Sequence, residues 1–238
     1  MIRFYAPDIE NDSVLPESES LHCCRVLRMR SGDEINVVDG KGNAYLCRIV
    51  KDHPKAAEVE IISKLPDEVA AVSTSITLAI APTKNSDRIE WLAEKAVEIG
   101  VDKLVFLQCH NSVRKTINAD RIKKVMISAM KQSLHSKLPE LVALIQLKDF
   151  VNSDLSDARF VGYCDEKIER LEFVKNYDGK EDITILIGPE GDFTSEEIEM
   201  LLDKDYKPVT FGPMRLRTET AALYALCATH ALISLHSR

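Results

Sequence analysis

The 238-residue sequence lacks the short motifs that mark several common enzyme classes. It contains no G-x-G-x-x-G segment opening a helix after a strand and no G-x-x-x-x-G-K-[ST] loop, which argues against the usual dinucleotide and nucleoside-triphosphate sites. The motifs G-x-S-x-G and H-E-x-x-H are absent too, so neither the usual serine-hydrolase nor the usual zinc-protease signature is present. The activity has to be sought in other features of the chain.

Metal-binding spacings and long apolar runs are also missing. The six cysteines form no C-x-x-C pair and no Cys/His spacing typical of zinc, so we expect no metal and interpret them as reduced, mostly buried thiols. The N-terminal segment lacks the apolar core of a signal peptide, and the most apolar long stretch, residues 220–235, is shorter than the ~18 residues of a spanning helix. We therefore expect a cytoplasmic protein with no membrane segment.

Positive charge is unevenly distributed in a chain whose net charge is -7. Residues 110–138 contain seven basic side chains and one acidic side chain, and Arg25, Arg28 and Arg30 form a second, smaller cluster. Basic runs are often only solvated helix faces. Two basic patches on an acidic protein nevertheless favour a polyanionic partner over a small neutral one.

The first part of the chain has the pattern of a small β-barrel. Short runs rich in Val and Ile predict strands at residues 34–38, 44–50 and 57–62, with a glycine-containing turn at residues 39–43. Residues 65–75 have no periodicity and contain an acid-proline break, which is typical of a linker. We expect a domain boundary there, between residues 1–70 and residues 71–238.

The second part of the chain alternates predicted strands and helices, which is typical of a mostly parallel sheet covered by helices. Asp87 is expected to cap the first of these helices and Gly100 to end it. Thr194 and Glu197 have the spacing of a capping box. The predicted fold class is α/β.

Two Gly-Pro turns follow apolar strands near the end of the chain: Gly188-Pro189 after residues 183–187, and Gly212-Pro213 after residues 208–211. In an open α/β sheet, ligands bind beyond the carboxyl ends of the strands, and glycine lets the backbone approach them. The two turns therefore predict one pocket walled by backbone. Each turn alone could equally be a strand-to-helix connection, with Thr218 capping the last helix.

These residues resemble a known family. LIGPEG at residues 186–191, followed by FGPMRLRTETA at residues 211–221, resembles the SPOUT-class 16S ribosomal RNA (uridine-N3)-methyltransferases of the RsmE type. Segments along the rest of the chain, from RFY at residues 3–5 to residues 84–101, resemble the same family. The resemblance implies a PUA-like RNA-binding β-barrel in residues 1–70 and a SPOUT methyltransferase domain with a deep C-terminal trefoil knot in residues 71–238. It also implies a homodimer, S-adenosyl-L-methionine as cofactor and 16S rRNA within the small subunit as partner.

The resemblance also implies three sets of site residues. Arg217 is the first candidate for a catalytic cation, and Glu219 or Glu190 could accept the proton of uridine N3. The expected cofactor-binding residues are Leu186, Ile187, Gly188, Pro189, Glu190, Gly191, Phe211, Gly212, Met214, Leu216, Arg217 and Thr218. The expected RNA-binding residues are Arg3, Arg25, Arg28, Arg114, Lys115 and Lys131.

Three positions depart from the pattern of that family. Asn111 stands where an arginine is usual, Lys131 where a glutamate is usual, and Asp192 where a glycine is commoner. These departures affect the expected RNA contacts more than the cofactor turns, which are intact. Two alternatives stay open: a SPOUT methyltransferase that acts on another RNA position, such as a ribose 2′-O, and a non-catalytic RNA-binding assembly factor.

Overall fold

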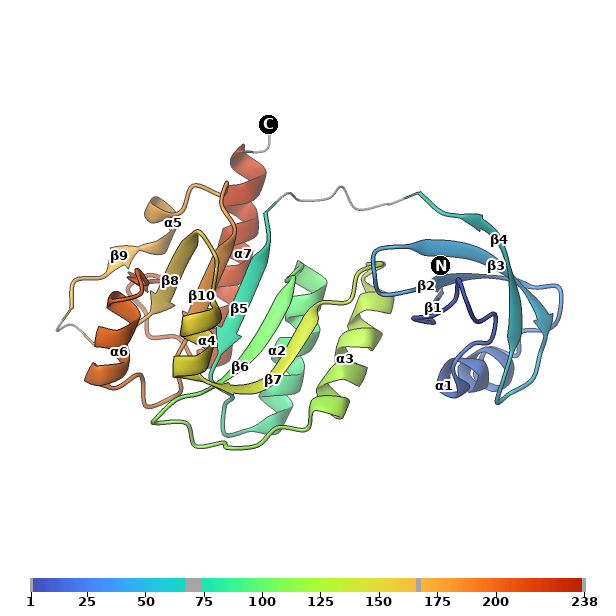
Figure 1. Cartoon of the computed structure of the whole chain (residues 1–238), viewed down its shortest axis with the longest axis horizontal. Helices are drawn as coiled ribbons and strands as arrows, with labels where there is room; N and C mark the ends of the chain where they lie inside the picture. Colours follow the sequence, from blue (N-terminus) through green and yellow to red (C-terminus); the bar gives the residue numbers. More distant parts are fainter. Residues whose placement is uncertain (1, 67–73, 166–167, 237–238) are drawn as a thin grey trace. The chain divides into compact units, whose positions relative to one another are not determined.

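A computed structural model of the chain describes residues 2–66, 74–165 and 168–236 (Figure 1). The chain forms two compact units, which we call unit 1 (residues 1–71 and 126–138) and unit 2 (residues 72–125 and 139–238). The boundary expected near residue 70 places residues 126–138 in the second domain, whereas in the structure they group with unit 1. Helix α3 (Ala119–Gln132) therefore begins in unit 2 and ends in unit 1.

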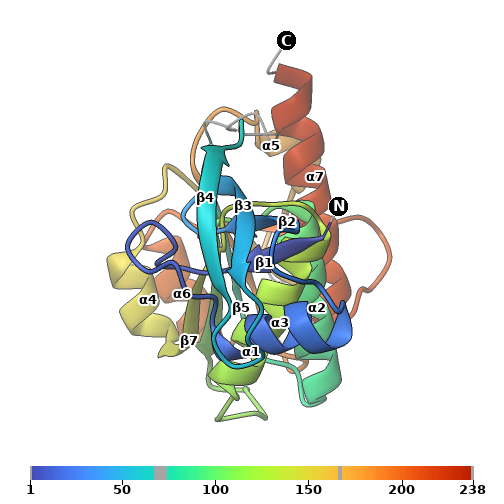
Figure 2. The same cartoon turned by 90° about the vertical axis from the view of Figure 1, so that its right-hand side faces the viewer.

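Unit 1 is built on a four-stranded sheet with the order β1-β2-β3-β4 (Figure 2). Strands β1 and β2 pair in parallel, and the other neighbours pair antiparallel. Apart from the end of α3, the elements of this unit are β1 (Arg3–Tyr5), α1 (Glu17–Leu21), the π-helix η1 (His22–Val26), β2 (Glu34–Val38), β3 (Ala44–Lys51) and β4 (Glu58–Lys64).

The hairpin between β2 and β3 forms at the turn that the sequence predicts. The carboxylate of Asp39 accepts hydrogen bonds from the backbone N–H of Lys41 at 2.7 Å and of Asn43 at 3.0 Å. A short polar side chain that binds its own following backbone is the usual way in which Asp starts a turn. The apolar residues of this unit pack into one core that includes Phe4, Cys23 and Val37.

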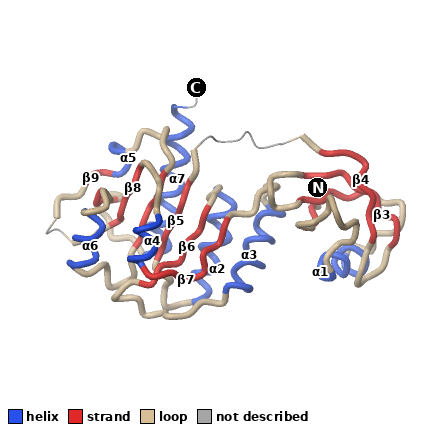
Figure 3. The backbone as a smooth tube through the Cα atoms, in the orientation of Figure 1, coloured by secondary structure: helices blue, strands red, loops and turns tan. Residues whose placement is uncertain are grey.

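Unit 2 is built on a seven-stranded sheet in which every pair of neighbours is parallel, with the order β7-β6-β5-β10-β8-β11-β9 (Figure 3). The α/β class with a mostly parallel sheet is therefore confirmed. The knot stays a prediction. The elements of this unit are β5 (Ile76–Ile80), α2 (Ser86–Ile99), β6 (Lys103–Gln108), β7 (Glu140–Gln146), α4 (Leu147–Ser153), β8 (Ala158–Gly162), β9 (Leu171–Glu172), α5 (Phe173–Asn176), β10 (Ile183–Ile187), α6 (Ser195–Leu202), β11 (Lys207–Thr210) and α7 (Thr218–His236), together with the start of α3.

Strand β10 lies in the interior of this sheet. It pairs with β5 on one side and β8 on the other, and all five of its residues are buried because helices cover both faces. Phe150 of α4 and Leu201 of α6 pack on the face that carries Leu186. Helices α2 and α7 contact each other, and α7 also contacts β5 and β10.

The helix ends show one difference from the sequence prediction. Helix α2 is capped by Asn85, whose side chain accepts from the backbone N–H of Asp87 at 2.9 Å, so the cap lies two residues before the predicted one. Gly100 ends the helix in the left-handed conformation, as predicted. The capping box of Thr194 and Glu197 at the start of α6 is also confirmed.

The cysteines are arranged as the sequence predicts. All six are free thiols, and four of them are buried, whereas Cys164 and Cys227 are exposed. Within the described ranges, no helix has both the length and the apolar character needed to cross a membrane. The described residues also contain no cluster of three or more His, Cys, Asp or Glu side chains that could hold a metal ion.

The buried position of Leu186 generates a stability prediction. Leu186→Ala is expected to lower the free energy of unfolding by about 2–5 kcal/mol, because the side chain is fully buried between the sheet and its helices. The matched control Leu202→Ala removes a side chain of α6 that is 39% exposed and should cost less than about 1 kcal/mol. Urea titrations followed by circular dichroism measure both; equal losses would contradict the assignment of Leu186 to the core.

Candidate active site

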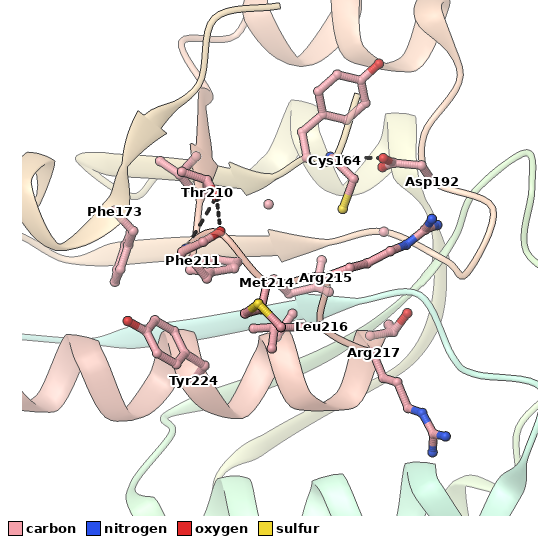
Figure 4. A pocket seen from close by; sticks show the side chains of 18 of the residues that line it. Cys164, Phe173, Asp192, Thr210, Phe211, Met214, Arg215, Leu216, Arg217 and Tyr224 are labelled. Carbon is pink, nitrogen blue, oxygen red and sulfur yellow. Dashed lines mark hydrogen bonds between the residues drawn. The ribbon is translucent and has the colours of Figure 1, made fainter. Parts of the chain in front are cut away.

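A cavity of about 1400 Å³ lies in unit 2 at the carboxyl ends of three neighbouring strands (Figure 4). Strand β8 pairs with β10 on one side and with β11 on the other, so the loops that follow these parallel strands meet at one edge of the sheet. Residues from all three loops and from the first turns of α7 line the cavity. This arrangement confirms that the two Gly-Pro turns share one pocket.

Glycines allow the three loops to approach closely. A Cβ atom added to Gly162, at the end of β8, would lie 2.8 Å from the ring of Phe211 and 3.1 Å from Cδ1 of Ile187. A Cβ atom on Gly188 would lie 2.9 Å from the ring of Phe193. Since real contacts are not this short, a side chain at position 162 would push neighbouring loops apart, and one at position 188 would displace Phe193 within the loop after β10.

The turn after β11 is held by a side chain that sequence reasoning did not single out. The hydroxyl of Thr210 donates to the carbonyl of Gly212 at 3.0 Å and accepts from its N–H at 3.4 Å (Figure 4). Gly212 has φ +118°, a backbone conformation that favours glycine. The turn is therefore fixed in one shape with its backbone facing the cavity.

Most of the expected cofactor-binding residues lie around this cavity. Ten line it: Ile187, Gly188, Pro189, Glu190, Phe211, Gly212, Met214, Leu216, Arg217 and Thr218. Leu186 and Gly191 do not. Successive side chains of a strand point to opposite faces, and Leu186 points into the core, so its expected place beside the cofactor is corrected to a core position.

The two candidate proton acceptors differ in their surroundings. Glu219 is buried in the first turn of α7, and its carboxylate is ion-paired with Arg88 of α2 at 3.2 Å. Glu190 is exposed, and one of its carboxylate oxygens accepts from the backbone N–H of Lys84 at 3.0 Å. The structure therefore brings both acids to the cavity but engages Glu219 in an ion pair with a second cavity residue.

The two arginines of the loop after β11 extend in different directions. In Figure 4 the side chain of Arg215 reaches toward Asp192, whereas that of Arg217 extends away from it. Arg217 immediately precedes α7, and its carbonyl accepts from the N–H of Ala221 at 2.8 Å, so the first turn of the helix fixes its backbone. Its side chain is exposed at the cavity lining.

The loop after β10 is tied to a second loop through Asn111. The side-chain amide of Asn111 donates to the carbonyls of Gly191 at 3.1 Å and of Asp192 at 3.0 Å. The backbone N–H of His110 donates to the carboxylate of Glu197 at 2.8 Å. Asn111, which stands where the family usually has an arginine, thus places a hydrogen-bond donor against the loop that carries Gly188-Pro189.

Unit 1 contains four of the six expected RNA-binding residues. Arg3 is 6% exposed and donates to the carbonyl of Leu134, and Lys131 pairs with Glu19 at 2.5 Å. These two side chains are occupied within the unit. Arg25 and Arg28 are exposed.

The other two expected RNA-binding residues lie in unit 2. The guanidinium of Arg114 donates to the carbonyls of Thr83 at 3.2 Å and Lys84 at 2.7 Å, so it holds the segment that leads into α2. Lys115 is exposed. Arg25, Arg28 and Lys115 are thus the members of the expected set whose charges face solvent.

The cavity lining includes one thiol, that of Cys164. Burial and the nearby Asp192 carboxylate raise the pKa of Cys164, while Arg215 and Arg170 act in the opposite direction. Burial also raises the pKa of Cys109, near the cavity, to about 12. Both thiols are therefore protonated at neutral pH, and neither has the lowered pKa of a catalytic nucleophile.

A family model described as an RNA methyltransferase domain matches residues 71–230, which is more than half of the chain. The chain belongs to the RNA methyltransferase family. A second model, described as an RNA methyltransferase PUA domain, matches residues 15–62 and confirms the predicted PUA domain of this methyltransferase.

Named relatives cover nearly the whole methyltransferase. The ribosomal RNA small subunit methyltransferase E of Rickettsia conorii is 26% identical over 208 residues, which are 87% of this chain and 84% of that protein. A crystal structure from Porphyromonas gingivalis, described as a probable rRNA-methyltransferase, is 39% identical, has a TM-score of 0.92 and covers 99% of this chain and 100% of that chain. The structure of a ribosomal RNA small subunit methyltransferase E from Neisseria gonorrhoeae bound to S-adenosyl methionine is 26% identical, with a TM-score of 0.84 and 98% coverage of both chains.

Several cavity residues of the methyltransferase were missed by sequence reasoning. Arg88, Cys164, Asp192 and Arg215 belong to no expected site set, although all four line the cavity. The position of Tyr224 at the cavity could have been predicted from the sequence. It follows Arg217 by seven residues, or about two helical turns, and therefore lies on the same face of α7 as the start of the helix. The residues after β8 carry no comparable signal, since sequence alone does not show that β8 lies between β10 and β11.

The contacts of Asn111 generate a prediction about the loop at residues 188–193. Asn111→Ala is expected to speed amide hydrogen exchange in this loop about fivefold or more, because two hydrogen bonds worth about 0.5–1.5 kcal/mol each are lost. Mass spectrometry measures the exchange, with the amides of β6 as the reference for any global loss of stability.

The matched control for that experiment is Val113→Ala, which removes an exposed side chain from the same segment. It should leave exchange in residues 188–193 unchanged. Equal exchange rates in Asn111→Ala and the control would show that Asn111 does not hold the loop.

Proposed function

We propose that this chain transfers a methyl group from S-adenosylmethionine to N3 of a specific uridine in 16S rRNA of the small ribosomal subunit. The main support is one arrangement: the backbone loops after β10 and β11 face the same cavity, and Arg217 lies in its lining. Membership of the RNA methyltransferase family and relatives named as small-subunit enzymes favour this reaction over others.

The cavity fits an adenosylated cofactor in size and in lining. Its volume of about 1400 Å³ exceeds the ~300–1,000 Å³ of most small-molecule pockets, which leaves room for a flipped base beside the cofactor. Ile187, Leu216 and Tyr224 offer apolar surface to an adenine ring. The backbone of Gly188 and Gly212 lines the cavity, and the carbonyl of Gly212, which accepts one hydrogen bond from Thr210, has a second lone pair for a ligand.

The acceptor nitrogen determines what the chain itself has to supply. The bound cofactor supplies a methyl group activated by its sulfonium. Uridine N3 carries a proton and becomes a good nucleophile only as that proton leaves, so the site needs a base or a cation that stabilises the uridine anion. In our proposal Arg217 provides the cation and binds a carbonyl oxygen of the uracil, since a guanidinium stays charged at any physiological pH.

For the proton acceptor, the surroundings of the two acids favour Glu190. Glu219 is buried and paired with Arg88, so moving it toward a substrate would leave a buried cation without its partner. In our proposal Glu219 and Arg88 instead fix the start of α7 and hence the backbone of Arg217. Glu190 is exposed at the cavity, where it can take the proton directly or through a water molecule.

The homodimer and the C-terminal knot belong to the same proposal. Helices α2 and α7 carry large apolar side chains on the surface of unit 2: Trp91 is 46% exposed, Tyr224 43% and Leu235 71%. Large apolar side chains exposed on neighbouring helices are common at protein interfaces. Because Tyr224 also lines the cavity, a second copy covering this surface would lie beside the site.

Methylation of small subunits tests the proposed function directly. Incubation with labelled S-adenosylmethionine and unmodified small subunits should place one methyl group on 16S rRNA and arrest reverse transcription at a single uridine, because N3 methylation blocks base pairing. Label in a ribose 2′-O-methyl group would support the alternative specificity. The absence of any transferred label would support a non-catalytic RNA-binding factor.

The role of Arg217 is tested by Arg217→Ala. The variant is expected to lower the methylation rate by at least about 10²–10³-fold, because the developing negative charge loses its counterion. Its affinity for S-adenosylmethionine, measured by calorimetry, should stay within a few-fold of wild type. Arg217→Lys keeps the positive charge but lacks the paired N–H donors of the guanidinium, so it should retain intermediate activity. Loss of cofactor binding in both variants would assign Arg217 to the cofactor instead.

The proposed contribution of unit 1 to RNA binding is tested by reversing the charge of two exposed side chains. The double variant Arg25→Glu with Arg28→Glu is expected to weaken binding to small subunits. The slope of the logarithm of the binding constant against the logarithm of the salt concentration should become shallower by roughly 0.7–0.9 for each lost phosphate contact. The control Lys55→Glu with Lys64→Glu changes the net charge equally at two other exposed positions. Filter-binding titrations in which both double variants behave alike would exclude a local footprint at η1.

A further inference from the structure

One part of the cavity lining carries charges that the proposed methyl transfer does not use. Asp192 comes from the loop after β10, Arg215 from the loop after β11, and Asp165 and Arg170 from the segment after β8. The catalytic proposal involves Arg217 and Glu190 only. A ligand that binds these further side chains has to carry both a positively charged and a negatively charged group.

The carboxylate of Asp192 is fixed by hydrogen bonds, and the backbone of this residue has an uncommon conformation. Asp192 has φ +61°, a conformation uncommon for residues other than glycine. Its side chain accepts from the N–H of Cys164 at 3.0 Å and of Phe193 at 2.9 Å, and its carbonyl accepts from Asn111 at 3.0 Å. Strained residues that are fixed from several sides are concentrated at ligand sites.

The guanidinium of Arg215 acts on this carboxylate, and that of Arg170 is anchored to the segment after β8. In Figure 4 Arg215 extends toward Asp192 from the opposite loop, and the charge of Arg215 opposes the rise in the pKa of Asp192 that burial causes. Arg170 donates to the carbonyls of Tyr163 at 3.2 Å and of Cys164 at 3.1 Å, so it is anchored to the segment that Asp192 also binds. Two acids, Asp192 and Asp165, and two cations thus line the cavity on the segments after β8, β10 and β11.

We propose that Asp192 and Arg215 bind the aminoacyl tail of S-adenosylmethionine, an inference that rests on the proposed function. Asp192 accepts hydrogen bonds from the ammonium group of the tail, and Arg215 pairs with its carboxylate. Charge-assisted bonds of this kind are among the stronger polar contacts in a site. An RNA phosphate in the same place would pair with the arginines, but Asp192 would repel it.

Two ligands that differ only in the tail test this assignment. S-adenosylhomocysteine carries the aminoacyl tail, whereas 5′-methylthioadenosine has the same adenosine and thioether without it. Calorimetry on the wild-type protein should give at least tenfold tighter binding of S-adenosylhomocysteine. Asp192→Asn and Arg215→Gln should each lower that ratio below about threefold while the affinity for 5′-methylthioadenosine stays within twofold.

The matched control is Glu172→Gln, which neutralises another acid of the cavity lining, one that is paired with Lys175 at 2.8 Å. It should leave the ratio of affinities unchanged. Because Arg215 is exposed, Arg215→Gln keeps the test valid even if Asp192→Asn fails to fold, and thermal unfolding without ligand checks each variant.

Three outcomes overturn the assignment. Equal affinity of the wild type for the two ligands would show that the tail is not recognised, with cofactor binding intact. An equal loss of both ligands in the Asp192 and Arg215 variants would show that these residues only shape the loops. No binding of S-adenosylhomocysteine to the wild type would overturn the proposed function itself.

Discussion

The position of β8 between β10 and β11 decides where this protein can bind a ligand. Each of the two later strands pairs with β8 in parallel, so three loops leave the sheet at the same edge and within reach of one another. Gly162, at the end of β8, has no room for a side chain against Phe211 and Ile187, which shows how closely these loops approach. The backbone surfaces of the two Gly-Pro turns face one cavity because of this pairing, and the loops also carry Glu190, Asp192, Arg215 and Arg217.

Two of the departures from the family pattern contact each other in the structure. The side-chain amide of Asn111 donates to the carbonyl of Asp192, and a Cβ atom added to the intervening Gly191 would lie 3.3 Å from the Cβ of Asn111. An arginine is longer than asparagine and would need a different path past this loop. The two unusual residues therefore act together. Asn111 holds the loop in a shape in which Asp192, a residue other than glycine, has a positive φ.

Much of the fold could be predicted from the sequence, whereas only part of the site could. Period and capping signals placed β10, α6 and the end of α2, because these depend on residues close together in the chain. Each Gly-Pro turn could be recognised for the same reason, and their shared pocket was predicted from the general rule that ligands bind beyond the carboxyl ends of parallel strands. The sequence could not show that Arg88 would reach the buried Glu219, or that Asp192 would bind the backbone of Cys164, since both contacts join segments brought together only by the strand order. The error at Leu186 came from assigning a strand residue to the pocket without deciding which face its side chain occupies.

The order of the elements along the chain has a consequence for biosynthesis. The loop after β11 and the first turns of α7 supply a large share of the cavity lining, yet they follow all the other strands of unit 2 in the chain. A nascent chain that has emerged only as far as β10 can pair β5, β6, β7 and β8, but it lacks one wall of the site. Because the parts of a chain nearer the N-terminus leave the ribosome first, the residues that complete the cavity are made after those that form the centre of the sheet. The ion pair between Glu219 and Arg88 joins the start of α7 to α2, which is made much earlier.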